Sequence, residues 1–395
     1  IYPGAANFLI HCYRRGKKVY IISHKTEFGH YDKKKISLRK AALNFFEKNN
    51  LFSEAYGLTK DDIFFFDTRK EKANKIAELN CDYFIDDLPE VFAESNFPTK
   101  TKKILFDIDS EQVDKGSFNS WYKINDFFFK GIEEADIITY VENGTGKKVK
   151  SAKKINGRGN SSIFRIINKS GNIYSGKLYN DPTFDSENRL EKESKAFKFL
   201  HINKINYVPK VIWKDDNLNF GLYEWINGSE IKNISNDNII DAITFVKTLA
   251  DLSKKTDYGE FELASSACIS GKNIMDQIYE RYKKINIFSN LFPELKNYLN
   301  DELFIAIETI LKFSKQNWPG YFYSNLSKQN QLLSPSDFGF HNTILNEGGV
   351  RFIDFEYFGW DDPVKLTSDF ILHPGMDLTC LLYTSDAADD SLRVD

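Results

Sequence analysis

Three polar side chains lie close together in an otherwise apolar and aromatic stretch near the carboxyl end of the sequence. Asp337 and Asn342 have the spacing DxxxxN, and Asp354 ends the run VRFID. Phosphoryl transfer to a hydroxyl needs one carboxylate to accept the hydroxyl proton and further oxygen ligands to hold Mg²⁺ on ATP. A hairpin turn at residues 347–349 would bring Asn342 and Asp354 side by side. We therefore predict that Asp337 is catalytic and that Asn342 and Asp354 bind the metal.

The run SDFGFHNTIL, with FIDFE and WDDP after it, resembles the aminoglycoside phosphotransferase and choline kinase family, which is related to the protein kinases. The resemblance implies an α+β bilobal protein-kinase-like fold with ATP and Mg²⁺ as cofactors. Asp337 occupies the family's base position, so His341 is interpreted as a packing or loop-orienting side chain. Asp369 in TSDFILHP is expected to be the structural aspartate that closes the family pattern.

The same resemblance implies a nucleotide site upstream. NGRGNSS resembles the glycine-rich loop that covers the phosphates, although Ser162 stands in place of the third glycine of GxGxxG. Lys177 is expected to meet the α and β phosphates, with Glu193 as its partner and Glu191 as the alternative. GLYEWINGSEI resembles the hinge whose backbone meets adenine. The expected nucleotide-binding residues are Gly157, Gly159, Ser161, Ser162, Lys177, Glu193, Glu224 and Trp225.

The first part of the chain resembles the haloacid dehalogenase-like phosphatases. IISHKT contains Ser23, whose hydroxyl would bind a phosphoryl oxygen, and FIDDLPEV supplies Asp86 and Asp87 as expected Mg²⁺ ligands. Lys72 is the expected charge-neutralising lysine, with Lys70 as the alternative. The family's nucleophilic aspartate would precede the first residue, so this domain is expected to be truncated and to lack phosphatase activity.

Alternating strand and helix patterns must position the phosphatase-like residues. Such alternation favours an α/β, Rossmann-like, doubly wound sheet with ligands beyond the carboxyl ends of its strands. The predicted strands are residues 18–23, 63–66, 83–85 and 103–106, and the predicted helices are residues 38–49 and 70–79.

A small β lobe and a larger helical lobe must position the kinase-like residues. Short strands with tight turns are predicted over residues 137–179, and helical periodicity follows Arg189, for example at residues 237–252, 274–282 and 303–311. The predicted organisation is a truncated haloacid dehalogenase-like domain at 1–110, a linker at 111–135, a kinase-like domain at 136–379, and a segment at 380–395 that resembles a translated sequencing adapter and is excluded from fold reasoning.

Composition limits the class of partner. The chain has 395 residues with 53 Lys and Arg against 56 Asp and Glu, a net charge of −3, which gives no bulk electrostatic reason to bind nucleic acid or anionic membrane. The four cysteines have neither CxxC spacing nor a disulfide framework, so a reducing, cytoplasmic location is expected. No apolar run approaches the roughly 20 residues that span a bilayer. The oligomeric state is left open.

These patterns predict an ATP-dependent phosphotransferase that acts on a hydroxyl of a small polar molecule, such as a sugar, amino sugar or amino alcohol, with an attached phosphatase-like domain. The alternative is a non-catalytic nucleotide-binding regulator on a kinase-like scaffold. The three residues of the first cluster, together with Lys177, argue against that alternative. Protein phosphorylation has less support because no DFG or APE segment follows Asp354.

Overall fold

The chain, seen here as a computed structural model, forms two compact units. Unit 1 comprises residues 1–190 and 211–225, and unit 2 comprises residues 191–210 and 226 onward. The structure describes residues 1–29, 33–110, 116–155, 161–182, 187–289, 292–318 and 320–373. The predicted phosphate-loop residues Gly157 and Gly159 and the adapter-like segment 380–395 lie outside the described residues.

The amino-terminal part of unit 1 alternates strand and helix, as predicted. Its elements are α1 (Ala5–Arg14), β1 (Ile21–His24), α2 (Leu38–Lys48), β2 (Ile63–Phe66), α3 (Arg69–Glu78), β3 (Tyr83–Asp86), α4 (Pro89–Phe92), β4 (Lys102–Phe106), β5 (Ser117–Phe118) and α5 (Trp121–Phe129). The strands are parallel, but they form a pair β1–β2 and a separate sheet β3–β4–β5 instead of the single predicted sheet. The two sheets remain separate because no described strand pairs with both β1 and β3.

The range predicted as a linker contains regular structure in its described part. β5 pairs in parallel with β4, and Ser120 caps the start of α5, where its side chain accepts a hydrogen bond from the backbone of Lys123. Ile124 of α5 is fully buried in a cluster with Phe8 of α1 and Phe106 of β4. This packing makes α5 part of the folded unit, because its buried residue Ile124 packs against α1 and β4.

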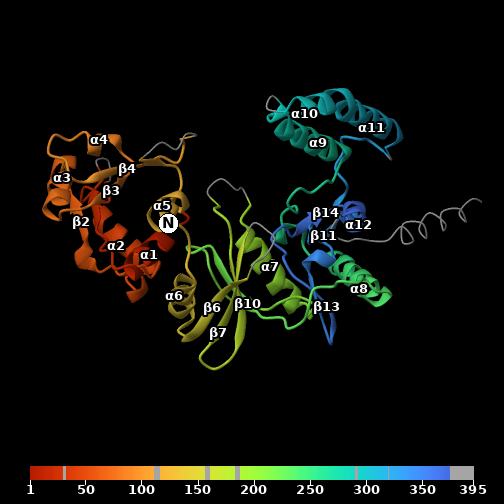
Figure 1. Ribbon diagram of the computed structural model, residues 1–395, viewed down its shortest axis with the longest axis horizontal. Helices are drawn as coiled ribbons and strands as arrows, with labels where there is room; N and C mark the ends of the chain where they lie inside the picture. Colours follow the sequence, from red (N-terminus) through yellow and green to blue (C-terminus); the bar gives the residue numbers. More distant parts are fainter. Residues whose placement is uncertain are drawn as a thin grey trace, which may run out of the picture. The chain divides into compact units, whose positions relative to one another are not determined.

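A five-stranded antiparallel sheet forms the rest of unit 1. Its strands are β6 (Val149–Ile155), β7 (Ser162–Asn168), β8 (Ile173–Leu178), β9 (Val211–Asp215) and β10 (Phe220–Glu224), in the order β6-β7-β8-β10-β9. Helix α6 (Glu134–Thr145) lies along this sheet (Figure 1). One buried cluster joins Phe164 and Phe220 of the sheet, Tyr140 of α6 and Ile10 of α1, so the amino-terminal helix and the sheet share a core.

Unit 2 is mostly helical, as predicted. Its elements are α7 (Arg189–Ile202, in this unit from Glu191), α8 (Asn236–Ser253), α9 (Gly271–Asn286), α10 (Pro293–Asn297), a π-helical turn (Tyr298–Leu303), α11 (Phe304–Asn317), β11 (Leu332–Ser334), β12 (Thr343–Asn346), β13 (Gly349–Phe352), β14 (Gly359–Asp361) and α12 (Pro363–Leu372). Phe245 of α8 stacks on Phe352 of β13 with 4.3 Å between ring centroids, and Phe338 packs on Phe352 at 5.2 Å. This aromatic cluster supports the loop that follows β11.

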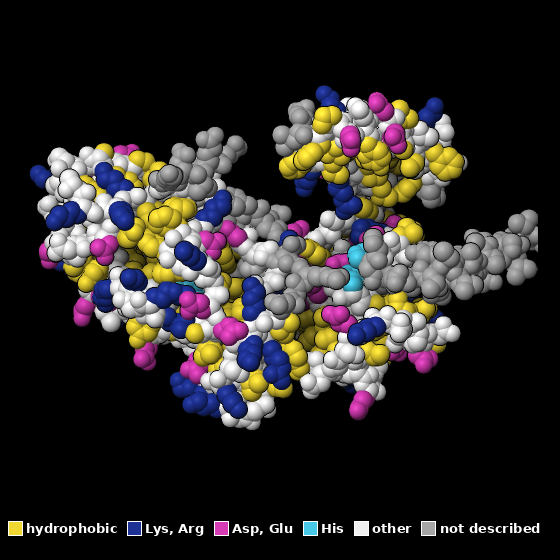
Figure 2. Space-filling model, viewed as in Figure 1, with side chains coloured by type: hydrophobic (Ala, Val, Ile, Leu, Met, Phe, Trp, Pro, Cys, Tyr) yellow, Lys and Arg dark blue, Asp and Glu magenta, His cyan; other side chains and the backbone are white. Residues whose placement is uncertain are grey.

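Apolar side chains are exposed over the α9 to α11 region, where Figure 2 shows many of them at the surface. Ile305, Ile310 and Phe313 of α11 are exposed by 58%, 60% and 66%. No helix within the described ranges combines the length and the apolar character that a bilayer span requires.

Candidate active site

The loop after β11 is closed by hydrogen bonds between its two ends. The Asn342 side-chain amide donates to the Asp337 carbonyl oxygen at 2.9 Å and to Asp337 Oδ2 at 3.2 Å. Ser336, just before it, has a φ of 68° and donates from its hydroxyl to the Ser265 carbonyl oxygen at 3.0 Å. The DxxxxN segment thus forms a loop that folds back on itself, and the Asn342 side chain at its end holds the Asp337 carboxylate in place.

The predicted hairpin is confirmed. Strands β12 and β13 pair with Thr343 opposite Phe352, and the Ile353 N–H donates to the Asn342 carbonyl oxygen at 2.9 Å. Asn342 and Asp354 therefore lie at the same end of the hairpin. The Asn342 NH₂ group donates to Asp337, so the Asn342 amide oxygen is the atom of this side chain that could bind a metal. An amide oxygen and a carboxylate are hard oxygen donors, which Mg²⁺ prefers. The residues present fit this ion.

Asp354 has a strained backbone. Its φ is 67°, in the left-handed region that few residues other than glycine adopt. Such a conformation costs on the order of 1–2 kcal/mol and persists only where the surrounding structure holds it. The next residue is held by α7, because the Phe355 N–H donates to Glu193 Oε1 at 3.0 Å.

His341 contacts the predicted catalytic carboxylate directly. Its Nε2 lies 3.0 Å from Asp337 Oδ1. The hydrogen bond with His341 lowers the pKa of Asp337, and this effect exceeds the opposing effect of burial. Asp337 is therefore ionised and able to accept a proton at neutral pH. The contact agrees with the predicted loop-orienting role of His341.

Of the two glutamates predicted as partners of Lys177, Glu193 is 2% exposed and Glu191 is exposed. Lys177 is itself 5% exposed on β8, between Ile163 of β7 and Gly221 of β10. Because Lys177 belongs to unit 1 and both glutamates to unit 2, the predicted ion pair stays a prediction.

The other predicted nucleotide-binding residues lie at strand ends. Ser161 precedes β7, Ser162 begins it, and Glu224 ends β10 with an exposed side chain. Trp225 follows, and the Arg165 guanidinium lies 5.4 Å from its ring centroid. Sequence analysis did not single out Arg165. The register of the sheet places Arg165 on the same face as Lys177, because Arg165 lies opposite Ser175 and Lys177 is two residues further along β8.

The carboxyl-terminal end of the predicted hinge sequence is tied to the hairpin that carries Asn342. Ser229 and Leu345 exchange two backbone hydrogen bonds of 3.0 and 2.9 Å. A side chain at Gly228 would meet the Leu345 carbonyl oxygen at 2.3 Å, so only glycine permits this approach. The hinge sequence therefore helps to position the site.

Asp361, the first aspartate of WDDP, is fully buried, although the sequence did not single it out. Its Oδ1 accepts hydrogen bonds from the backbones of Cys268 at 2.9 Å and Asp362 at 2.8 Å, and Lys365 lies 3.2 Å from Oδ2. Asp369, the predicted structural aspartate, has a side chain that is 47% exposed and accepts from Lys365 at 2.8 Å.

In unit 1 the structure brings together two of the predicted phosphatase-like residues. Lys72, in the first turn of α3, forms a buried ion pair with Asp86 at the end of β3, and the Leu88 N–H donates to Asp86 Oδ1 at 3.0 Å. Lys70 and Asp87 are exposed, and Ser23 lies near the end of β1. Burial thus favours Lys72 over Lys70.

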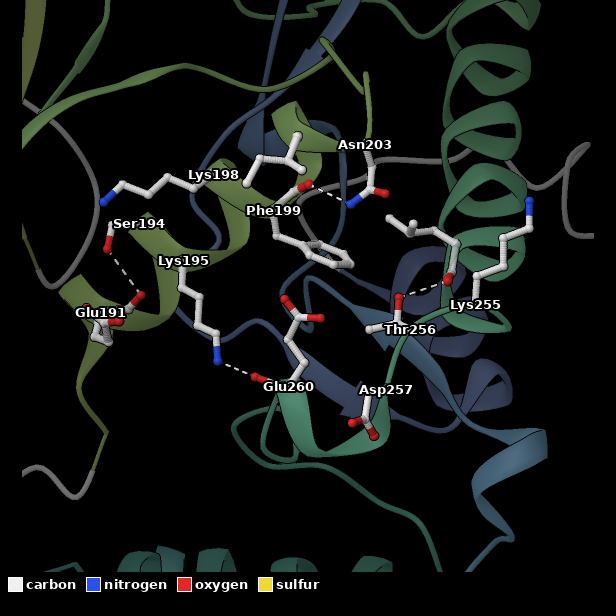
Figure 3. A pocket seen from close by; sticks show the side chains of 12 residues that line it. Glu191, Ser194, Lys195, Lys198, Phe199, Asn203, Lys255, Thr256, Asp257 and Glu260 are labelled. Atoms are coloured by element: carbon white, nitrogen blue, oxygen red, sulfur yellow. Dashed lines mark hydrogen bonds between the residues drawn. The ribbon is translucent and has the colours of Figure 1, made fainter.

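A groove of about 470 Å³ lies elsewhere in unit 2, between α7 and the end of α8 (Figure 3). Phe199 and Leu252 line it, and Lys195 reaches across to the Glu260 carbonyl oxygen. None of Asp337, Asn342 and Asp354 lines this groove.

Comparison with known proteins gave matches among solved structures. No protein-family model matches the sequence, and the search of curated proteins gave no match. A spectinomycin phosphotransferase in complex with ADP and spectinomycin is 16% identical, with 59% of this chain and 72% of that chain covered and a TM-score of 0.41. A choline kinase from Cryptosporidium parvum is 15% identical, with 59% and 67% covered and a TM-score of 0.43. A Plasmodium vivax ethanolamine kinase is 20% identical, with 67% and 76% covered and a TM-score of 0.42.

These three solved structures are thus kinases and phosphotransferases. At these identities and TM-scores the function proposed below rests on the chain's own residues.

Proposed function

We propose that this chain is an ATP- and Mg²⁺-dependent phosphotransferase that phosphorylates a hydroxyl of a small polar molecule, such as a sugar, amino sugar or amino alcohol. One observation carries the proposal: the fold holds an ionised carboxylate, Asp337, on the same closed loop as Asn342, and places Asn342 beside Asp354 at the end of one hairpin.

Each of these residues has a distinct role. Asp337 orients the acceptor hydroxyl and takes its proton, and His341 holds the carboxylate in place through the 3.0 Å contact. Asn342 and Asp354 would hold Mg²⁺, which neutralises the phosphate charge when it is bound. Lys177 binds the α and β phosphates.

The remaining proposed nucleotide contacts include two residues at strand ends of the β-sheet, Ser162 at the start of β7 and Glu224 at the end of β10. Ser161 and Ser162, with Gly157 and Gly159, cover the phosphates, and the backbone at Glu224 and Trp225 meets adenine. Glu193 supports the site from α7, where its hydrogen bond to the Phe355 N–H fixes the residue after Asp354. This bond gives the buried Glu193 carboxylate a hydrogen-bond donor.

The amino-terminal part is proposed to be a haloacid dehalogenase-like, phosphatase-like region in which Ser23, Lys72, Asp86 and Asp87 bind a phosphoryl group and Mg²⁺. The buried pairing of Lys72 with Asp86 at a strand end supports this proposal, since it holds both charged groups where a phosphate and an ion could be bound.

The proposal is tested by offering the purified chain a panel of sugars, amino sugars and amino alcohols and measuring ATP consumption. With the best acceptor, Asp337→Asn should keep ATP binding and lower turnover by about two to four orders of magnitude. Asp251→Asn, exposed on α8 and paired with Lys254, is the matched control and should retain wild-type turnover.

Turnover unchanged in Asp337→Asn would remove this residue from the mechanism. ATP binding by the wild type without turnover on any acceptor would overturn the proposal in favour of a nucleotide-binding regulator.

A further inference from the structure

A second imidazole lies beside the pair formed by Asp337 and His341. His373, which follows α12, stacks on His341 with ring centroids 4.2 Å apart and 11° between the ring planes. Orienting Asp337 requires one histidine only, and that bond is already made by His341 Nε2. The presence of His373, 32 residues further along the chain, therefore calls for a separate explanation.

The three side chains have the spacing of a metal site. One ligand atom from each of Asp337, His341 and His373 lies within 4.8 Å of the other two. Two ligands of a tetrahedral ion with bonds of about 2.0–2.1 Å are about 3.3 Å apart, close to the 3.0 Å between Asp337 Oδ1 and His341 Nε2. The His373 nitrogen lies within 4.8 Å of the other two ligand atoms. A tilt of the two rings away from parallel would bring it to the separation of about 3.3 Å that a tetrahedral ion requires.

The donor types select a particular class of ion. Mg²⁺ prefers oxygen ligands, whereas two imidazoles and a carboxylate suit borderline ions such as Zn²⁺. Asp337 and His373 are half-buried and His341 is exposed, so an ion can reach them from solvent.

We propose that Asp337, His341 and His373 form a binding site for a divalent transition ion, with Zn²⁺ as the probe, separate from the proposed Mg²⁺ ligands Asn342 and Asp354. Three protein ligands leave one position for water. The ion replaces the hydrogen bond between His341 and Asp337 and occupies the carboxylate oxygen that would accept the acceptor's proton. Zn²⁺ therefore inhibits phosphotransfer. This inhibition rests on the proposed function, whereas the binding of Zn²⁺ to the three side chains does not depend on it.

Direct binding is measured first, in the absence of ATP and Mg²⁺, by competition between the full chain and a chromophoric zinc chelator. His373→Gln should lower the Zn²⁺ affinity by at least about tenfold, the minimum expected when one of three ligands is lost. His341→Gln should do the same, which keeps the test valid if either variant fails to fold. His24→Gln, at the end of β1 in unit 1, is the control and should bind as the wild type does.

Wild-type affinity in both His373→Gln and His341→Gln, or no Zn²⁺ binding by the wild type, would overturn the site.

The consequence for activity is tested with Mg²⁺ and ATP held constant. Zn²⁺ should inhibit the wild type, a zinc-selective chelator should restore turnover, and His373→Gln should need at least about tenfold more Zn²⁺ for half inhibition, relative to its own zinc-free rate. Zn²⁺ binding through these residues without phosphotransfer on any acceptor would refute the proposed function and keep the site. Phosphotransfer inhibited equally in wild type and His373→Gln would keep the function and refute the site.

Discussion

Asp136 joins the amino-terminal helix to the helix that supports the β-sheet, and its charge should be a main determinant of the stability of unit 1. It is fully buried in the first turn of α6. Its carboxylate accepts from Arg14 at 2.5 Å, from Arg15 at two contacts of 3.1 Å and from the Glu133 N–H at 2.9 Å. His11 Nε2 lies 3.6 Å away.

Asp136→Asn keeps the shape of this side chain and removes its charge, leaving two arginines against a neutral amide. Removing one partner of a buried ion pair costs about 3–5 kcal/mol. The arginine side chains are 23% and 19% exposed, so water compensates part of that loss and we expect about 2–4 kcal/mol. Glu133→Gln is the control: Glu133 pairs with Arg15 at 3.2 Å but is 62% exposed, so its change should cost less than about 1 kcal/mol.

Urea unfolding gives the two free energies, and hydrogen exchange shows where the stability is lost. If α1 and the sheet share one core, Asp136→Asn should speed amide exchange in both α1 and β7. Burial alone would raise the pKa of Asp136, but Arg15, His11 and Arg14 hold it below the usual value. The difference from wild type should therefore persist above about pH 4 and shrink as pH falls further. Equal losses in Asp136→Asn and Glu133→Gln would refute the role of the buried charge, and faster exchange in α1 alone would refute the shared core.

Three further predictions follow from single sites. Asp354→Ala should abolish the Mg²⁺-dependent part of the affinity for a nonhydrolysable ATP analogue, measured by calorimetry, and equal affinity in wild type would remove Asp354 from the metal site. Burial lowers the pKa of His11 below its ordinary value of 6.5, so stability should decline as pH falls from 6.5 toward the lower folded pKa. An unchanged slope of stability against pH in the variant His11→Gln would contradict this. Lys72→Met leaves the buried Asp86 carboxylate without its cation and should cost about 3–5 kcal/mol in urea unfolding, whereas the exposed Lys70→Met should cost less than about 0.5 kcal/mol; similar losses would show that the pair is not buried as described.

Local sequence patterns were sufficient for the elements and loops that depend on neighbours along the chain. The second predicted strand, residues 63–66, agrees with β2. The DxxxxN spacing and the Gly348-Gly349 turn predicted a loop and a hairpin that place Asn342 near Asp354, and both are present. Such features form because few residues separate the interacting groups, so backbone geometry and turn chemistry decide them.

Tertiary structure decided which side chains are buried and which distant residues meet. Periodicity could not choose between Lys70 and Lys72, because that depends on whether Asp86 lies opposite. It could not show that α1 packs with α6 through Asp136, nor that His373 stacks on His341. An apolar or alternating pattern states that one face of an element is covered, but only the packing of segments far apart in the chain determines what covers it.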